Sequence, residues 1–211
     1  MLHLEKLFYY SILKITTKLK KELSEKVYMY QDDISKIRIK DYMRKSMKIR
    51  KITPTDDRRL AEIVRVNLEH YGLDIPGTAY FDPELDHLST FYRAASGRAY
   101  FVLTDEENHV LGGAGFAAFA GRKNCAELQK LYLDPAVQGQ GLGYVLLEKV
   151  QQEAKASGYQ ELYLETHHVL AAAIHMYEKL GYVRIAPPVG TVHSTMDTFL
   201  VKSLAGKAGL Q

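Results

Sequence analysis

Residues 137–144 read VQGQGLGY, with glycine at every second position from 139 to 143. The stretch follows the apolar run LYLDP (131–135) and precedes VLLEKV, which predicts a loop between a strand and a helix. A dinucleotide-binding fingerprint needs G-x-G-x-x-G after the first strand of its domain, but Tyr144 occupies the third glycine position and the preceding strand is the fourth. A Walker A loop needs a Lys-Ser or Lys-Thr pair, and none follows. What remains is a glycine-rich helix start whose backbone amides can bind an anion.

The segments on either side of this loop alternate between strand and helix patterns, which predicts one α/β domain. Thr55 is expected to cap the first helix, and Asp82-Pro83 to start the second. We expect the following elements in order: a strand at 48–53, helices at 56–71 and 82–95, antiparallel strands at 98–104, 109–119 and 126–133, a helix at 143–157, a strand at 161–166, a helix at 170–180, and strands from 182 and at 196–204.

The composition is that of a soluble globular protein, with 46% hydrophobic and 25% charged residues in 211. The single cysteine, Cys125, excludes an internal disulfide and a cysteine-based zinc site, and we expect no metal. No apolar run approaches the roughly 20 residues needed to span a bilayer. These features favour a cytoplasmic protein.

Residues 1–46 differ from the rest, because they carry 11 Lys and Arg against 6 Asp and Glu and contain neither glycine nor proline. The remaining residues are nearly neutral, which argues against nucleic-acid binding by the folded part. The basic segment has helical apolar spacing and could lie on a membrane or a partner, but we favour a solvated or loosely docked extension. Translation from Met47 or Met43 is a further alternative. We therefore expect an N-terminal extension (1–46), one domain (47–205) and a tail (206–211).

Two motifs together resemble the GNAT family of N-acetyltransferases. Residues 138–143 fit the acyl-CoA-binding pattern Q-x-x-G-x-G, and AAAIHMYEKLGYV (171–183) is similar to the family's N-x-x-A-I-x-L-Y-E-K-x-G-F. Leu170 stands where the family has an asparagine that often contacts the pantetheine arm, so that contact is open to question here. The resemblance implies a central mixed sheet of about seven strands, splayed between the fourth and fifth, with about four helices around it.

The resemblance also implies acetyl-CoA as co-substrate and a set of residues that bind it. The pantetheine arm would enter the gap between the splayed strands and pair with the exposed edge of the fourth strand. The implied cofactor-binding residues are Leu131, Tyr132 and Leu133 at that edge, the backbone of Gln138, Gly139, Gln140, Gly141, Leu142, Gly143 and Tyr144, and Ala173 with Tyr177 on the following helix.

Two side chains are our candidates for the chemistry. Tyr177 matches the family tyrosine that faces the departing sulfur and would donate a proton to it, the alternative being that it only packs or hydrogen-bonds the cofactor. Glu127 lies where several family members carry a catalytic glutamate and would deprotonate the acceptor amine, the alternatives being a structural or acceptor-recognition role. Strand alternation predicts that Glu127 shares a face with Gln129, Leu131 and Leu133.

The expected function is direct acetyl transfer from acetyl-CoA to a primary amine in a ternary complex, with a small-molecule amine or amino acid favoured. The alternatives are a non-catalytic acyl-CoA-binding module and a protein lysine or N-terminal acetyltransferase. Tyr80, Phe81, Glu127 and His193 are expected to bind the acceptor, while His167 and His168 are expected in a loop at the strand end. A homodimer stays open as an assembly state.

Overall fold

The computed structural model describes residues 47–189 and 195–205. The predicted N-terminal extension, the C-terminal tail and His193 lie outside the described residues, and the proposed domain boundaries stay predictions. Within the described part of the chain, no helix is both long enough and apolar enough to cross a membrane.

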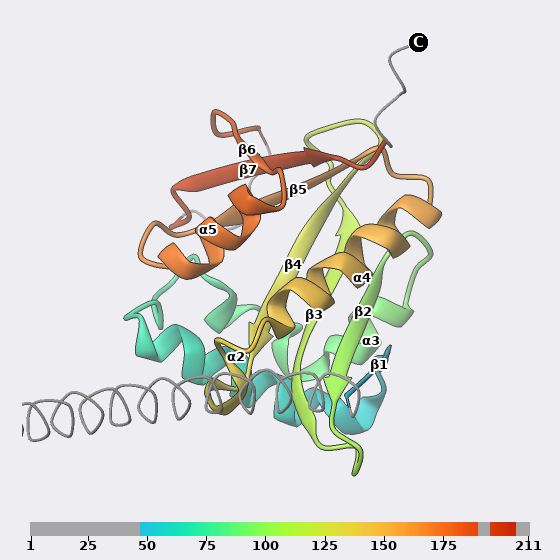
Figure 1. The fold of residues 1–211 in the computed structure, drawn as a ribbon, viewed down its shortest axis with the longest axis vertical. Coiled ribbons are helices and arrows are strands. Elements are labelled where there is room, and N and C mark those ends of the chain that lie inside the picture. Colours follow the sequence, from blue (N-terminus) through green and yellow to red (C-terminus); the bar gives the residue numbers. More distant parts are fainter. Residues whose placement is uncertain (1–46, 190–194, 206–211) are drawn as a thin grey trace, which may run out of the picture. The chain divides into compact units, whose positions relative to one another are not determined.

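The described residues form a seven-stranded mixed sheet in the order β1-β2-β3-β4-β5-β7-β6 (Figure 1). Neighbouring strands are antiparallel except for β4 and β5, which are parallel. The strands are β1 (Lys48–Lys51), β2 (Ala99–Thr104), β3 (Val110–Ala118), β4 (Cys125–Leu133), β5 (Glu161–Thr166), β6 (Val183–Arg184) and β7 (Thr198–Ser203). The mixed sheet predicted from the sequence is confirmed.

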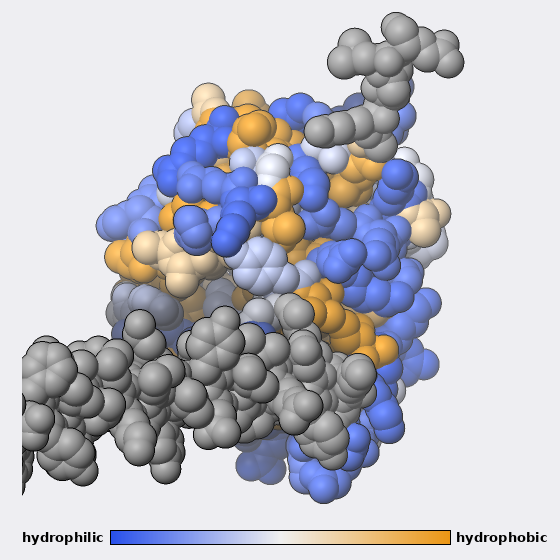
Figure 2. Space-filling model, in the orientation of Figure 1, coloured by the Kyte–Doolittle hydropathy of each residue, from blue (hydrophilic) through white to orange (hydrophobic). Residues whose placement is uncertain are grey.

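Four α-helices of the described chain cover the two faces of this sheet: α2 (Asp57–His70), α3 (Leu88–Arg93), α4 (Leu142–Ala156) and α5 (Ala171–Lys179). One core contains buried side chains of α4 and α5, and a second contains those of α2 and α3. Strand β2 serves both, because Phe101 and Leu103 join the first core while Tyr100 and Val102 join the second. On the face that Figure 2 shows, apolar side chains form separate groups between hydrophilic ones.

Each long helix forms because its apolar residues recur on one face. In α2 the buried Leu60, Val64 and Leu68 are spaced four apart, and in α4 the buried Leu142, Leu146 and Val150 are spaced likewise. The first α4 residue therefore already belongs to the core. This fixes the position of the glycine loop that precedes it.

The expected capping role of Thr55 is wrong. Thr55 lies inside a 3-10 turn, Pro54–Asp56, and the residue that precedes α2 is Asp56. The Asp56 carboxylate is buried and accepts hydrogen bonds from Arg50 Nη1 and Nη2 at 2.7 and 2.8 Å and from the Thr53 amide at 2.8 Å. The turn is thus fixed by the charged pair with Arg50 of β1 and by the hydroxyl of Thr53, which donates to Asp56 Oδ2 at 2.8 Å, and not by Thr55.

The expected helix start at Asp82-Pro83 is also wrong, since α3 begins only at Leu88, after a 3-10 turn at Leu85–His87. Asp82 and Glu84 instead lie near the ammonium of Lys130 on β4, at 2.5 and 3.1 Å from its Nζ. Lys130 is far from Asp82 and Glu84 in the sequence, so the local helix signals gave no indication of these ion pairs.

Strands β4 and β5 separate partway along their length (Figure 1). They pair only at Cys125 with Glu161, Ala126 with Leu162, and Glu127 with Tyr163. Beyond Glu127, the edge of β4 that faces β5 has no strand partner among the described residues. The splay predicted between the fourth and fifth strands is confirmed.

Candidate active site

Strand β4 carries a bulge beside the splayed gap. In its pairing with β3, Lys130 and Leu131 together face the single residue Ala114. Lys130 has φ of 50°, a left-handed conformation that non-glycine residues seldom adopt. The hydroxyl of Tyr100 donates a hydrogen bond of 2.8 Å to the carbonyl oxygen of Lys130, which holds the bulge in place.

Because of the bulge, the side chains of β4 do not alternate between the two faces of the sheet as the sequence predicts. Leu131 and Leu133 pack against the core under α4 and α5, whereas Tyr132 packs against the core under α2 and α3. Glu127 lies on the α2 and α3 side, where its neighbour Gln129 accepts a hydrogen bond from Tyr92 of α3. The prediction that Glu127 shares a face with Leu131 and Leu133 is therefore wrong, because the extra residue at the bulge reverses the pattern.

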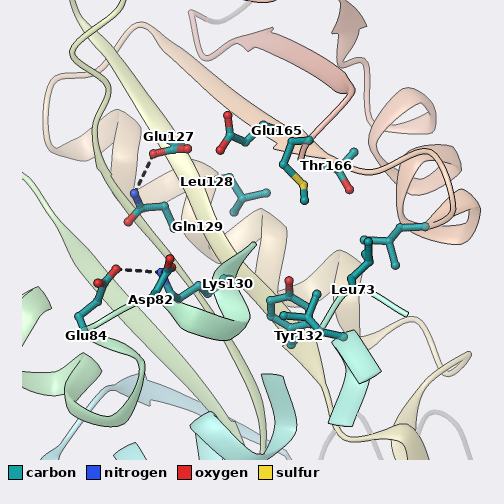
Figure 3. Close-up of a pocket in the computed structure, with 14 residues that line it drawn as sticks. Leu73, Asp82, Glu84, Glu127, Leu128, Gln129, Lys130, Tyr132, Glu165 and Thr166 are labelled. Atoms are coloured by element: carbon teal, nitrogen blue, oxygen red, sulfur yellow. Dashed lines mark hydrogen bonds and ion pairs between the residues drawn. The ribbon is translucent and has the colours of Figure 1, made fainter. Parts of the chain in front are cut away.

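A pocket of about 100 Å³ lies where β4, β5 and the segment before α3 meet. Its wall includes Glu127 from β4 and Glu165 and Thr166 from the end of β5. Figure 3 shows Glu127 and Glu165 together at one end of the pocket and Lys130 at the other. The parallel register explains the first pair, because Glu127 is opposite Tyr163 and Glu165 lies two residues further on the same face of β5.

The Glu127 carboxylate is buried, with 6% of the residue exposed, and belongs to a hydrogen-bonded chain. Gln129 donates from Nε2 to Glu127 Oε2 at 2.7 Å, and its own Oε1 accepts from the Tyr92 hydroxyl at 2.8 Å. This arrangement fixes one carboxylate oxygen of Glu127. Sequence reasoning identified Glu127 but missed Glu165, whose position only the pairing of β4 with β5 reveals.

Lys130 supplies the positive charge in the pocket wall. Its side chain is 5% exposed, and its ion pairs with Asp82 and Glu84 join β4 to the segment that closes the pocket from the α2 side. Four carboxylates and one ammonium thus line the pocket, with the ammonium beside two of the carboxylates. Sequence analysis assigned no role to Lys130.

The glycine loop between β4 and α4 has the backbone that the sequence predicts for an anion site. Gly139 and Gly141 have φ of 71° and 80°, which other residues adopt only under strain. No acceptor among the described residues takes a hydrogen bond from the amides of Gly139, Gln140 or Gly141. A Cβ at Gly139 would meet no atom within 4 Å, so the loop surface is open there.

The side chain of Gln138 joins this loop to α2. Its Nε2 donates to Asn67 Oδ1 at 2.7 Å and to the carbonyl oxygen of Leu133 at 3.1 Å. Asn67 donates from Nδ2 to the same Leu133 oxygen at 2.9 Å. Gln138 therefore holds the end of β4 and the start of the loop in a fixed relation, and the carbonyl of Leu133 is already occupied.

Tyr177 of α5 packs in the core under α4 and α5, on the face of the sheet opposite to Glu127, and does not line the pocket. Burial raises the pKa of its phenol above the ordinary value, so Tyr177 is protonated throughout the working pH range. Burial and then the nearby Tyr177 raise the pKa of Tyr132 as well.

The other predicted site residues are dispersed. Tyr80 donates from its hydroxyl to Glu69 Oε1 at 2.7 Å, Phe81 is 57% exposed, and neither lines the pocket. Leu170 does line the pocket, and Ala173 packs against the core under α4 and α5.

His167 and His168 lie beyond the end of β5 beside Asp197, and His168 contacts the Asp197 carboxylate. The ligand atoms of these three residues lie within 4.8 Å of one another, but His168 and Asp197 are exposed. No metal ion is needed to explain this contact, because a histidine and an aspartate hydrogen-bond directly.

The description of the matching family model is "Acetyltransferase (GNAT) family", and the match covers residues 67–182. This range includes the splayed strands, the bulge, the glycine loop and Tyr177. The core of the candidate site therefore falls within the matched segment.

Two curated relatives and one solved structure give the same indication. The chain is 35% identical over 159 residues to the uncharacterized N-acetyltransferase YjgM of Escherichia coli K12, covering 74% of this chain and 94% of YjgM. It is 32% identical over 114 residues to the L-amino acid N-acyltransferase MnaT of the same organism, covering 51% and 66%. The structure of yncA, a putative acetyltransferase from Salmonella typhimurium with its cofactor acetyl-CoA, superposes with a TM-score of 0.60 at 27% identity, covering 78% and 97%.

Proposed function

The chain belongs to the GNAT acetyltransferase family and is an acetyl-CoA-dependent N-acetyltransferase, and on this premise we propose that it acetylates a small primary amine by direct transfer. The observation that carries this proposal is the meeting of three features at one place. The open edge of β4, the unpaired amides of the glycine loop and the buried carboxylate of Glu127 all belong to one strand and the loop that follows it.

The glycine loop fits the pyrophosphate of a CoA molecule. Its amides at Gly139, Gln140 and Gly141 precede the first turn of α4, where a helix has further unpaired amides and a partial positive charge. Without Cβ atoms at Gly139 and Gly141, a phosphate can approach the backbone closely. We assign the pyrophosphate contacts to the backbone of residues 138–144.

The unpaired edge of β4 fits an extended amide-containing arm such as pantetheine. Successive strand residues direct their backbone groups to opposite edges, and the Tyr132 carbonyl lies against Gly112 of β3, so Leu131 is the residue whose backbone groups face the gap. The Leu133 carbonyl is engaged by Asn67 and Gln138. We therefore place the pairing with the arm at Leu131. Bound there, acetyl-CoA supplies a thioester whose carbonyl carbon takes the lone pair of the acceptor nitrogen while its carbon–sulfur bond breaks.

Tyr177 is assigned as the donor to the departing sulfur. Because burial raises its pKa, the phenol keeps its proton at working pH and can donate a hydrogen bond as negative charge builds on sulfur. A raised pKa makes full proton transfer less favourable than it would be from an ordinary phenol. We therefore assign Tyr177 mainly to stabilising the thiolate, with the proton following as the thiol forms.

Glu127 is assigned as the base that takes the proton from the acceptor ammonium. Its carboxylate lines the pocket beside the gap, and the hydrogen bond from Gln129 holds it in place there. The proton passes from the amine to this carboxylate, directly or through one water, which makes the nitrogen lone pair available. The same geometry serves any amine small enough to reach Glu127.

A small acceptor is favoured by the pocket and by one relative. The pocket is about 100 Å³, which suits an amino group on a short chain better than a folded protein segment. MnaT is by its name an acyltransferase of L-amino acids, and we carry the amino acid class over as part of the proposal.

The test is release of the CoA thiol by the full-length chain, with acetyl-CoA and a panel of alkylamines, amino acids and lysine peptides. We expect turnover with small amines. CoA binding without turnover on any member would instead favour a non-catalytic CoA-binding module, and turnover confined to peptides would favour a protein acetyltransferase.

Two variants test the assigned roles in the same assay. Glu127→Gln should lower kcat by about 100-fold, within the usual range for loss of a general base, and should flatten the rise of rate with pH. Tyr177→Phe should lower kcat more than it weakens CoA binding, measured by calorimetry. An unchanged pH profile in Glu127→Gln would transfer the base role to ordered water.

A further inference from the structure

A second cavity of about 350 Å³ lies on the α2 and α3 side of the sheet. Its wall includes Phe91 of α3, Arg98 just before β2, and Ala117 of β3. Glu127 and Gln129 line this cavity as well as the first pocket, so the two spaces meet at the proposed base. A molecule whose amine lies at Glu127 can therefore extend into the second cavity.

The Arg98 guanidinium in this cavity has no acidic partner in the part of the chain that the structure describes. None of the described residues accepts a hydrogen bond from Arg98 or forms an ion pair with it, and its Nε is buried without a partner. Its Cζ lies 4.2 Å from the ring centroid of Phe91, which orients the group but satisfies none of its donors. By contrast, Arg50, Arg65 and Arg122 each pair with a carboxylate. A partly buried arginine with a buried, unpaired donor is suited to bind an anion.

The strand register places this guanidinium and the Glu127 carboxylate in one row. Ala117 of β3 is opposite Glu127 of β4, and Ala99 of β2 is opposite Phe116, so Arg98 is the residue next to Ala117 on the other side. Two strand spacings separate Arg98 from Glu127, or about 10 Å between Cα atoms. Between them Ala117 contributes only a methyl group, which leaves room above the sheet.

We propose that Arg98 binds the carboxylate of the acceptor while Glu127 receives its amine, so that the acceptor is an amino acid. An amino acid places its nitrogen and a carboxylate oxygen roughly 3 Å apart, and two hydrogen bonds of about 2.9 Å extend that span to roughly 9 Å. This span is close to the roughly 10 Å between the Cα atoms of the two residues, whose side chains stand on the same face of the sheet. This inference rests on the proposed acetyltransferase reaction and names its acceptor class.

A carboxylate fits this site better than a phosphate does. Among residues 47–189 and 195–205, Arg98 is the only one that brings a guanidinium to the cavity, and the negative charge of Glu127 lies on the same wall, which disfavours a doubly charged anion. The fork of Arg98 matches a carboxylate with two parallel hydrogen bonds. The remaining wall, Ala117 to Ala120 with Phe91, is mostly apolar and would face the acceptor side chain.

The experiment compares each amino acid with its carboxamide, which keeps the amine and the side chain but removes the negative charge. In the full-length chain, we expect kcat/KM to be roughly 10- to 100-fold higher for the acid, the range of one charged hydrogen-bonded pair. Arg98→Met should abolish this preference by raising KM for the acid, with less than about 3-fold change for the amide. Arg98→Lys should recover part of it. Arg93→Met is the matched control, because Arg93 is an exposed arginine on α3 outside the cavity.

The outcomes separate this inference from the reaction on which it rests. If no amine is acetylated at all, the proposed reaction fails. If amines are acetylated but acids have no advantage over amides, or if Arg98→Met weakens both equally, the assignment of Arg98 is overturned and its contact with Phe91 is structural. Phe91→Leu removes that contact but keeps the guanidinium, so the preference for the acid should survive in this variant.

Discussion

Lys130→Met is the substitution whose effect on stability can be worked out most directly. Lys130 is 5% exposed, and its ammonium lies 2.5 Å from Asp82 and 3.1 Å from Glu84. Methionine keeps the length of the side chain but leaves both carboxylates without this cation. Breaking a buried ion pair costs about 3–5 kcal/mol. Because the Glu84 side chain is 30% exposed, we expect the lower end, about 3 kcal/mol of unfolding free energy.

Urea unfolding followed by circular dichroism measures this change, and the melting temperature should fall by roughly 6–12 °C for a domain of this size. Lys149→Met is the matched control, since Lys149 pairs with Glu153 on the surface of α4 with 34% of its side chain exposed. A surface pair contributes at most about 1 kcal/mol. A loss below 1 kcal/mol in Lys130→Met, or equal losses in both variants, would refute the idea that Lys130 anchors the pocket segment.

Three further predictions concern other parts of the domain. Gly141→Ala should lower the free energy of unfolding by about 1–2 kcal/mol, because the backbone there has φ of 80°. The same substitution should weaken CoA binding measured by calorimetry, and an unchanged stability would contradict the left-handed geometry. Burial alone would raise the pKa of Asp56, but the hydrogen bonds from Arg50 and Thr53 outweigh burial and lower that pKa. The ionised carboxylate therefore stabilises the fold at pH values above its ordinary pKa, and this stabilisation is lost as the pH falls through the lowered value. Asp56→Asn should therefore cost about 2 kcal/mol at pH 7 and progressively less below about pH 4 in urea titrations, and a constant cost would contradict this. Burial raises the pKa of the Cys125 thiol to about 11, so a thiol reagent at pH 8 should label it only after unfolding.

Most elements and the conformation of the glycine loop could be predicted from the sequence because their signals are local. Gly139 and Gly141 have the positive φ that glycine readily adopts, and α2 and α4 each carry an apolar face. The bulge at Lys130 gave no such signal, since nothing in AELQKLYL marks a lysine for a left-handed conformation. The wrong prediction that Leu131 and Leu133 share a face of the sheet with Glu127 followed directly from this bulge.

The acceptor side was harder to predict because it depends on pairing between distant strands. Glu165 and Arg98 become neighbours of Glu127 only through the registers of β4 with β5 and of β2 with β3. The sequence at Asp82-Pro83 suggested a helix start, yet Asp82 and Glu84 form ion pairs with Lys130 of β4. The spacing of residues along the sequence gives no information about these contacts between distant strands.

The limited pairing between β4 and β5 has a consequence for the stability of the domain. Three residue pairs join these strands, whereas six join β5 to β7, so the sheet consists of two blocks connected by a narrow seam. A pantetheine arm along β4 would fill this seam with new hydrogen bonds, and binding of the donor would then raise the melting temperature through mass action. Amide hydrogen exchange should slow most at Leu131. The domain would be most cohesive when its donor substrate is bound.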